Sequence, residues 1–82
     1  MEKLDIRYMV YDQEYYFVTI RKNNESIELK LELVEFSSEM NHWDIPTKIV
    51  EKDGEVGFAI SNKVSRERIN LEVERIVNQY SL

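Results

Sequence analysis

The residues of this 82-residue chain that could perform chemistry are few, and their types exclude the common catalytic and metal sites. The chain has one histidine, His42, and no cysteine. Neither a zinc site with the usual ligands nor a cysteine–histidine pair can therefore be built from it. Two glycines are too few for a phosphate-cradling loop, and no serine is flanked by the glycines of a nucleophile elbow. We expect no enzyme, no metal and no cofactor, and we interpret His42 as a solvated loop residue.

The carboxylates form an acidic belt in the middle of the chain. The net charge is −5, and residues 25–55 hold nine of the sixteen acidic residues but three of the eleven basic ones. Glu28 and Glu32 would lie roughly 13 Å apart on one face of a strand, too far to share a proton. Such a belt disfavours binding to nucleic acid and is typical of a solvated surface. The candidate acidic face is Glu28, Glu32, Glu35, Glu39 and Asp44.

An aromatic cluster is the stronger candidate for a binding site. Met9, Tyr11, Tyr15 and Phe17 fall on the same side of two predicted strands, opposite to the predicted core. Aromatic side chains and methionine are enriched at the centres of protein interfaces. We predict an exposed patch of these four residues, with Trp43 as a fifth member, and we expect Tyr15→Ala with Phe17→Ala to abolish partner binding without unfolding the chain. The alternative is that the sheet curls and covers them.

The elements that position this cluster begin with a hairpin. Residues 4–11 and 15–22 are rich in β-branched and aromatic side chains and alternate with the period of a strand. A three-residue turn, 12–14, matches the parity of both strands better than a two-residue turn does. This register pairs Val10 with Tyr16, Tyr8 with Val18 and Ile6 with Ile20.

Residues 26–36, SIELKLELVEF, carry the clearest alternation and predict a central strand. A type I′ turn at Asn23-Asn24 would place Lys22 opposite Glu25. This register pairs Ile20 with Ile27, Val18 with Leu29 and Tyr16 with Leu31. Residues 37–46 are expected to follow the strand as a loop.

A second hairpin and a helix complete the chain. Asp53-Gly54 is a strong type I′ turn signal, and it joins strands over about 47–52 and 55–61 with Ile49 opposite Phe58. Ser65 is a good helix N-cap, and Val64 and Ile69 suit a hydrophobic staple. The apolar stripe of the predicted helix is Ile69, Val73, Ile76, Val77 and Tyr80.

These elements predict an α+β fold in a single domain covering residues 1–82. We expect an antiparallel, twisted five-stranded sheet or partial barrel, in the order β-β-β-β-β-α, with one C-terminal helix packed on it. The absence of cysteine, of a signal peptide and of an apolar stretch long enough for a membrane span favours a cytoplasmic protein with no membrane contact.

The function that these observations favour is a non-enzymatic protein–protein interaction module. It would contact a protein partner, or a second copy of itself, through the aromatic patch. One alternative is an acidic inhibitor that mimics nucleic acid and occupies a basic partner through the acidic face. A less favoured alternative is a single-stranded nucleic-acid binder that stacks bases on the sheet aromatics, because stacking sites lie in basic grooves.

Overall fold

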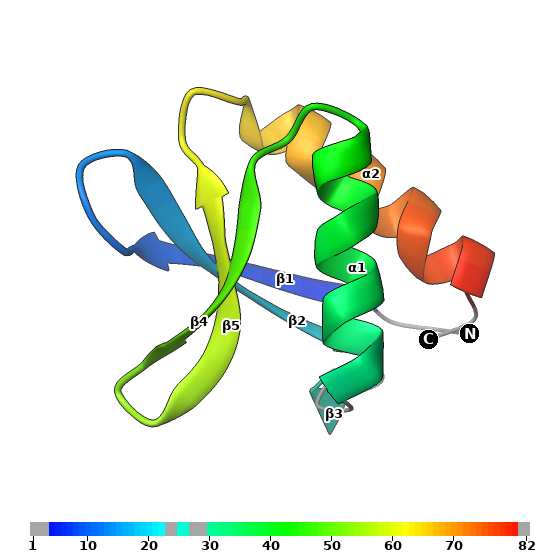
Figure 1. The fold of residues 1–82 in the computed structure, drawn as a ribbon, viewed down its shortest axis with the longest axis horizontal. Helices are drawn as coiled ribbons and strands as arrows, with labels where there is room; N and C mark the ends of the chain where they lie inside the picture. Colours follow the sequence, from blue (N-terminus) through cyan, green and yellow to red (C-terminus); the bar gives the residue numbers. More distant parts are fainter. Residues whose placement is uncertain (1–3, 23–24, 27–29, 81–82) are drawn as a thin grey trace.

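A computed structural model of the chain describes residues 4–22, 25–26 and 30–80, with side chains for 5–21 and 33–79. Figure 1 shows an antiparallel sheet with two helices. The elements are β1 (Leu4–Val10), β2 (Tyr15–Lys22), β3 (Glu25–Ser26), α1 (Lys30–His42), β4 (Thr47–Lys52), β5 (Glu55–Ser61) and α2 (Arg66–Tyr80).

The sheet has the strand order β1-β2-β5-β4, and the two-residue β3 pairs with the end of β2. The prediction of an α+β fold with an antiparallel sheet and a C-terminal helix is confirmed. The prediction of five full strands and one helix is wrong, because the described residues form four long strands, the two-residue β3 and two helices. Among the described residues, no helix is long and apolar enough to cross a membrane.

The error lies in the segment 26–36, whose described residues 30–36 belong to a helix and not to a central strand. After β3 the chain enters α1, so that Leu33 and Phe36 lie on a helix whose buried side continues with Met40. These three residues have the i, i+3, i+7 spacing of a helix, and leucine, lysine and glutamate are good helix formers. The edge of β2 that the predicted strand would use pairs instead with β5, which places Ile60 opposite Tyr16 and Phe58 opposite Val18.

Both hairpin registers and the C-terminal helix agree with their predictions. In the first hairpin Val10 pairs with Tyr16 and Ile6 with Ile20, and Lys22 lies opposite Glu25 at β3. In the second hairpin Ile49 pairs with Phe58, and Asp53 and Gly54 both have positive φ angles. The predicted pairing of Tyr16 with Leu31 is wrong, because Tyr16 pairs with Ile60 and Leu31 lies on α1. The predicted turn at 23–24 and the predicted partners Ile27 and Leu29 lie outside the described residues.

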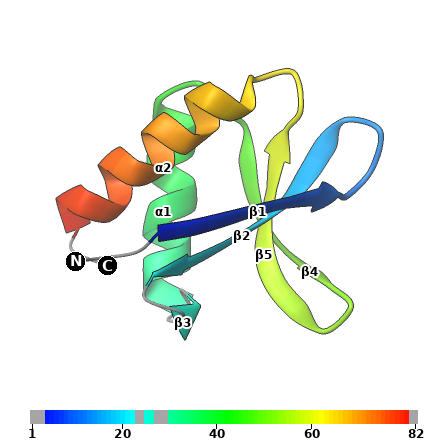
Figure 2. The ribbon, with the colours of Figure 1, turned by 180° about the vertical axis from the view of Figure 1, so that it is seen from behind.

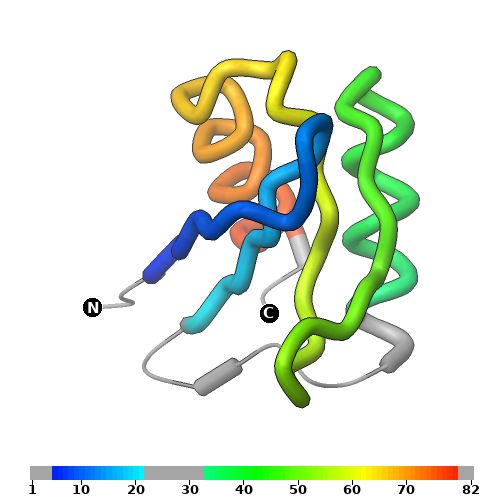
Figure 3. Tube along the Cα trace, turned by 90° about the vertical axis from the view of Figure 1, so that its left-hand side faces the viewer, coloured from blue at the N-terminus to red at the C-terminus, as the bar shows by residue number. Residues whose placement is uncertain are grey.

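The two hairpins cross at a steep angle, and both helices lie on one side of the sheet (Figures 1 and 2). Figure 3 shows the strands in front with α1 and α2 behind them. We call the side toward the helices the inner face and the opposite side the outer face. The main core fills the space between the inner face and the helices, and it consists of Val18, Ile20, Leu33, Phe36, Met40, Ile45, Phe58, Ile60, Ile69, Val73, Ile76 and Val77.

Main-chain and side-chain hydrogen bonds fix the start of α2 and the end of α1. The Ser65 hydroxyl oxygen accepts a hydrogen bond from the Arg68 N–H (3.2 Å), so the predicted N-cap of α2 is confirmed. At the end of α1, Asp44 has a φ of 61°, and the Ile45 N–H donates to the Met40 carbonyl (3.0 Å). This is the geometry of a Schellman motif, which reverses the chain and directs it into β4.

Candidate interaction surface

Phe17 is buried on the outer face, which contradicts its predicted exposure. Its side chain is 1% exposed, although it lies outside the main core. Its strand neighbours are Met9 on β1 and Ala59 on β5. Because Ala59 and the nearby Gly57 have almost no side chain, the sheet leaves room there for the aromatic ring, and the ring of Tyr11 stacks beside it at 6.5 Å.

Gly57 is required where β5 passes over β2. A Cβ atom at this position would lie 2.7 Å from the Val18 carbonyl oxygen and 2.9 Å from the ring of Phe17. No other residue fits without moving the backbone, since the nearer contact is to a main-chain atom. The glycine therefore lets the two hairpins approach closely, and β5 covers the ring of Phe17 at this position.

The outer face is also closed at its sides by two lysines of β4. The Lys52 ammonium group donates a hydrogen bond to the Val10 carbonyl of β1, and so connects the two outermost strands of the sheet. The Lys48 ammonium group lies over the Tyr15 ring, 5.3 Å from its centroid, and Tyr15 is half-buried. The sheet thus curls over its outer face, which is the alternative arrangement that the sequence left open.

The end of β1 is the part of the predicted patch that is open to solvent. Met9 is 49% exposed, Val10 is 72% exposed and Tyr11 is also exposed. β1 is an outermost strand of the sheet, so these side chains lie beside an edge whose only strand partner in the described part of the chain is β2. Three consecutive apolar side chains at an open strand edge form a surface suited to contact with another chain.

Trp43 is exposed but belongs to a different surface. It follows α1, where its carbonyl accepts a hydrogen bond from the Arg68 guanidinium (2.8 Å). The Arg75 guanidinium lies 4.7 Å from the centre of its ring. His42, predicted to lie in a loop, is instead the last residue of α1, and its ring meets the indole edge-on. The structure therefore places Trp43 at the junction of α1 and α2, away from the other four predicted residues.

The candidate acidic face differs from its prediction because part of it lies on the helix α1 and not on a strand. Glu35 and Glu39 lie one turn apart on α1, the first exposed and the second half-buried. Asp44 is exposed in the left-handed turn that ends the helix. The side chain of Glu32 and the whole of Glu28 lie outside the described residues. Because Glu32, Glu35 and Glu39 belong to α1, this part of the predicted acidic face lies on a helix and not on a strand.

One ionisable group of the sheet has a perturbed acidity. The Tyr8 hydroxyl group, on the inner face of β1, donates a hydrogen bond to the Asn70 side-chain oxygen of α2 (2.5 Å). Burial raises the pKa of Tyr8 to about 12, and the Arg66 guanidinium, 4.9 Å from the ring, opposes the increase. The contact joins β1 to α2 and so holds the open strand in place.

The contacts described at this surface are apolar packing, a hydrogen bond from Lys52 and a cation–π contact from Lys48. In the ranges that the structure describes, no three His, Cys, Asp or Glu side chains gather as metal ligands would. Val10 shares the strand parity of Ile6 and Tyr8, yet it is 72% exposed, so the alternation of the strand does not predict its exposure. The role of Gly57 has a signal in the sequence, because an isolated glycine within a strand pattern indicates a close approach of another backbone.

Comparison with protein-family models, with curated proteins and with solved structures found no match for this chain.

Proposed function

We propose that this chain is a non-enzymatic protein-interaction module that associates with a second copy of itself through the open edge of β1. The observation that carries the proposal is the exposure of Met9, Val10 and Tyr11 at that edge. A strand edge supplies main-chain hydrogen bonds to an added strand, and apolar neighbours add buried area. At Val10 the added strand would replace the Lys52 ammonium group, which donates a hydrogen bond to the Val10 carbonyl. Two identical edges can pair about a two-fold axis.

The charge of β1 supports a second copy as the partner. The chain carries a net charge of −5, which opposes contact between two acidic surfaces. On β1 the Arg7 guanidinium forms an ion pair with the Asp5 carboxylate (3.1 Å), so the strand is locally neutral. Two copies can therefore meet at this edge with little repulsion. A cytoplasmic location, which the lack of cysteine favours, is part of the same proposal.

The two other functional hypotheses have less support. A base-stacking platform needs exposed rings, and Phe17 is buried while Tyr15 is covered in part by Lys48. Mimicry of nucleic acid needs regularly spaced carboxylates, and only Glu35 and Glu39 of the acidic face share a described helix surface.

Light scattering coupled to size-exclusion chromatography tests the proposal. We expect the wild type to change from monomer to dimer as its concentration rises, and Val10→Lys to remain a folded monomer because it places a charge at the pairing edge. The matched control is Leu71→Lys, on the exposed side of α2, where the side chain is 64% exposed. The control should dimerise like the wild type. A wild type that is monomeric at every concentration, or a control that is equally impaired, would contradict the proposal.

A further inference from the structure

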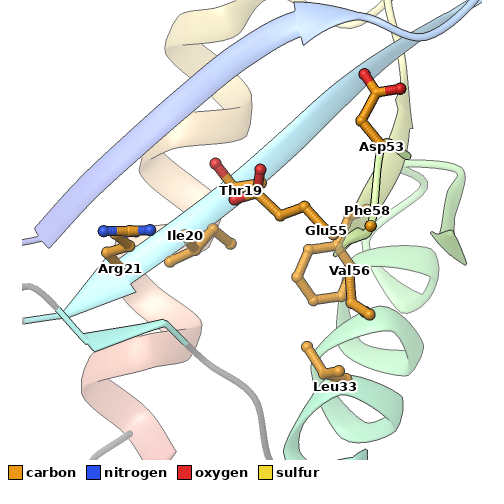
Figure 4. Close-up of a pocket in the computed structure, with 10 residues that line it drawn as sticks. Thr19, Ile20, Arg21, Leu33, Asp53, Glu55, Val56 and Phe58 are labelled. Carbon is orange, nitrogen blue, oxygen red and sulfur yellow. The ribbon is translucent and has the colours of Figure 1, made fainter. Parts of the chain in front are cut away.

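A groove of about 420 Å³ lies where β2 and β5 separate (Figure 4). The two strands pair from Tyr15–Ser61 to Val18–Phe58 and then diverge. On one bank, Thr19 and Ile20 pair with β1 alone among the described residues. On the other bank, residues 55–57 have strand partners in the described part of the chain on β4 alone. Because main-chain groups alternate in direction along an antiparallel strand, Ile20 on β2 and Val56 on β5 are the residues of these two segments whose N–H and C=O groups are directed toward the groove.

The bottom of the groove is apolar. Ile20, Leu33 and Phe58 line it from β2, α1 and β5, and all three also belong to the main core. Val56 lies on the β5 bank with 51% of its side chain exposed. Figure 4 shows Leu33, Val56 and Phe58 grouped on one side of the space. An apolar side chain placed in this groove would be removed from water by these residues.

The rim of the groove carries charged side chains, with more acidic than basic residues. Arg21 lines the β2 bank, whereas Asp53 and Glu55 line the opposite bank at the β4–β5 turn. Figure 4 shows the Glu55 side chain pointing from β5 toward β2. Two carboxylates and one guanidinium make the rim acidic, in a chain that is itself acidic. Such a rim attracts a basic group more strongly than an acidic one.

We propose that this groove binds an extended peptide segment of another protein, whose apolar side chains face the bottom and whose basic side chain lies beside Asp53 and Glu55. The open strand edges supply main-chain partners to an extended segment, as in recognition by strand addition. The apolar bottom and the acidic rim select the side chains. The site differs from the open edge of β1, although Lys52, which precedes Asp53, donates a hydrogen bond to the Val10 carbonyl at that edge. Peptide binding here would extend the function beyond self-association.

Three synthetic peptides test this proposal against the isotope-labelled full chain by nuclear magnetic resonance titration. The first is acetyl-Lys-Thr-Val-Thr-Val-Thr-Lys-amide. The second replaces both lysines with glutamate, and the third replaces both valines with asparagine. We expect the lysine–valine peptide to shift the amide signals of Thr19, Ile20 and Gly57, and to bind about tenfold more tightly than either of the other two.

Variants of the chain separate the charged rim from the rest of the surface. Asp53→Asn with Glu55→Gln should reduce the preference for lysine over glutamate to less than about twofold. The matched control is Glu74→Gln, which removes an exposed carboxylate of α2 and should change nothing. Val10→Lys should also bind the peptide normally, so that failure of the groove and failure of dimerisation are distinguishable. Absence of shifts with all three peptides, or equal loss in the control, would overturn the proposal.

Discussion

Met9 and Phe17 face each other across the first hairpin on the outer side of the sheet, yet one is half exposed and the other is fully buried. Both are large and apolar, and both have the same strand parity. The difference comes from the next strand. Phe17 has β5 beyond it, with Ala59 and Gly57 beneath its ring, whereas Met9 stands at the edge of the sheet. The burial of a side chain on a sheet face is thus decided by its neighbours across the strands rather than by its own type.

The same comparison separates stability from binding. The buried half of the outer face acts as a second, small core that joins the two hairpins. The open half, at the end of β1, contributes little to folding and is available for contact. Substitutions in the two halves should therefore have opposite signatures, with loss of stability in one and loss of association in the other.

The largest expected effect is that of Phe17→Ala. Removal of a buried phenylalanine side chain should lower the free energy of unfolding by about 3–5 kcal/mol. The matched variant Met9→Ala, on the directly opposite residue, should change it by less than about 1 kcal/mol. Equilibrium unfolding in urea, followed by circular dichroism, gives both values. A loss of this size would contradict the sequence-based expectation that Tyr15→Ala with Phe17→Ala leaves the fold intact.

Similar small losses in both variants would contradict the difference between the two halves. They would mean that the ring of Phe17 is accessible in solution and that the predicted four-residue patch exists after all.

A smaller effect is expected for Gly57→Ala. The added methyl group meets the Val18 carbonyl oxygen and the Phe17 ring, and we expect a loss of about 1–3 kcal/mol in the free energy of unfolding. The double variant Gly57→Ala with Phe17→Leu tests which contact matters. Because the nearest contact is to the main chain, the smaller side chain at position 17 should not restore stability. Full restoration would show that the ring alone requires the glycine.

The smallest effect concerns Tyr8, on the inner face of the same strand as Met9. Its pKa of about 12 in the folded chain lies above the ordinary value of 10.0. The unfolded chain therefore loses this proton first as the pH rises, and the folded chain binds more protons between these two values. The contribution of Tyr8 to stability is complete below pH 10 and is lost progressively toward pH 12.

Urea unfolding at a series of alkaline pH values, for wild type and Tyr8→Phe, measures this contribution. The decline in stability above pH 10 should be shallower in the variant, and the phenolate absorbance that develops near pH 12 in the wild type should be missing from it. Identical curves for the two proteins would show that Tyr8 titrates normally in the folded chain.

Local signals in the sequence were sufficient for the hairpins and for α2. Asp53-Gly54 defines its turn, and Ser65 begins α2 through a hydrogen bond within its own first turn. Such features depend on residues that are close in the chain. The registers of both hairpins followed from turn length and parity for the same reason.

The helix α1 could not be distinguished from a strand by local signals. Residues 27–33 alternate with a period of two, while Leu33, Phe36 and Met40 repeat with the period of a helix. The choice between strand and helix depends on β5, because β5 pairs with β2 at Tyr16 and Val18, where the predicted strand would have paired. The burial of Phe17 depends on the same distant strand. Both errors therefore have one origin, the pairing of β2 with β5.

Amide hydrogen exchange of β1 at low and high protein concentration tests the central claim most directly. If the open edge of β1 associates with a second copy, the Val10 amide, whose N–H is directed away from β2, should exchange more slowly at high concentration, while amides near Trp43 should not change. Phe17, already paired and buried, should be protected at both concentrations. Exchange at β1 that is independent of concentration would contradict the claim that this edge is the contact surface.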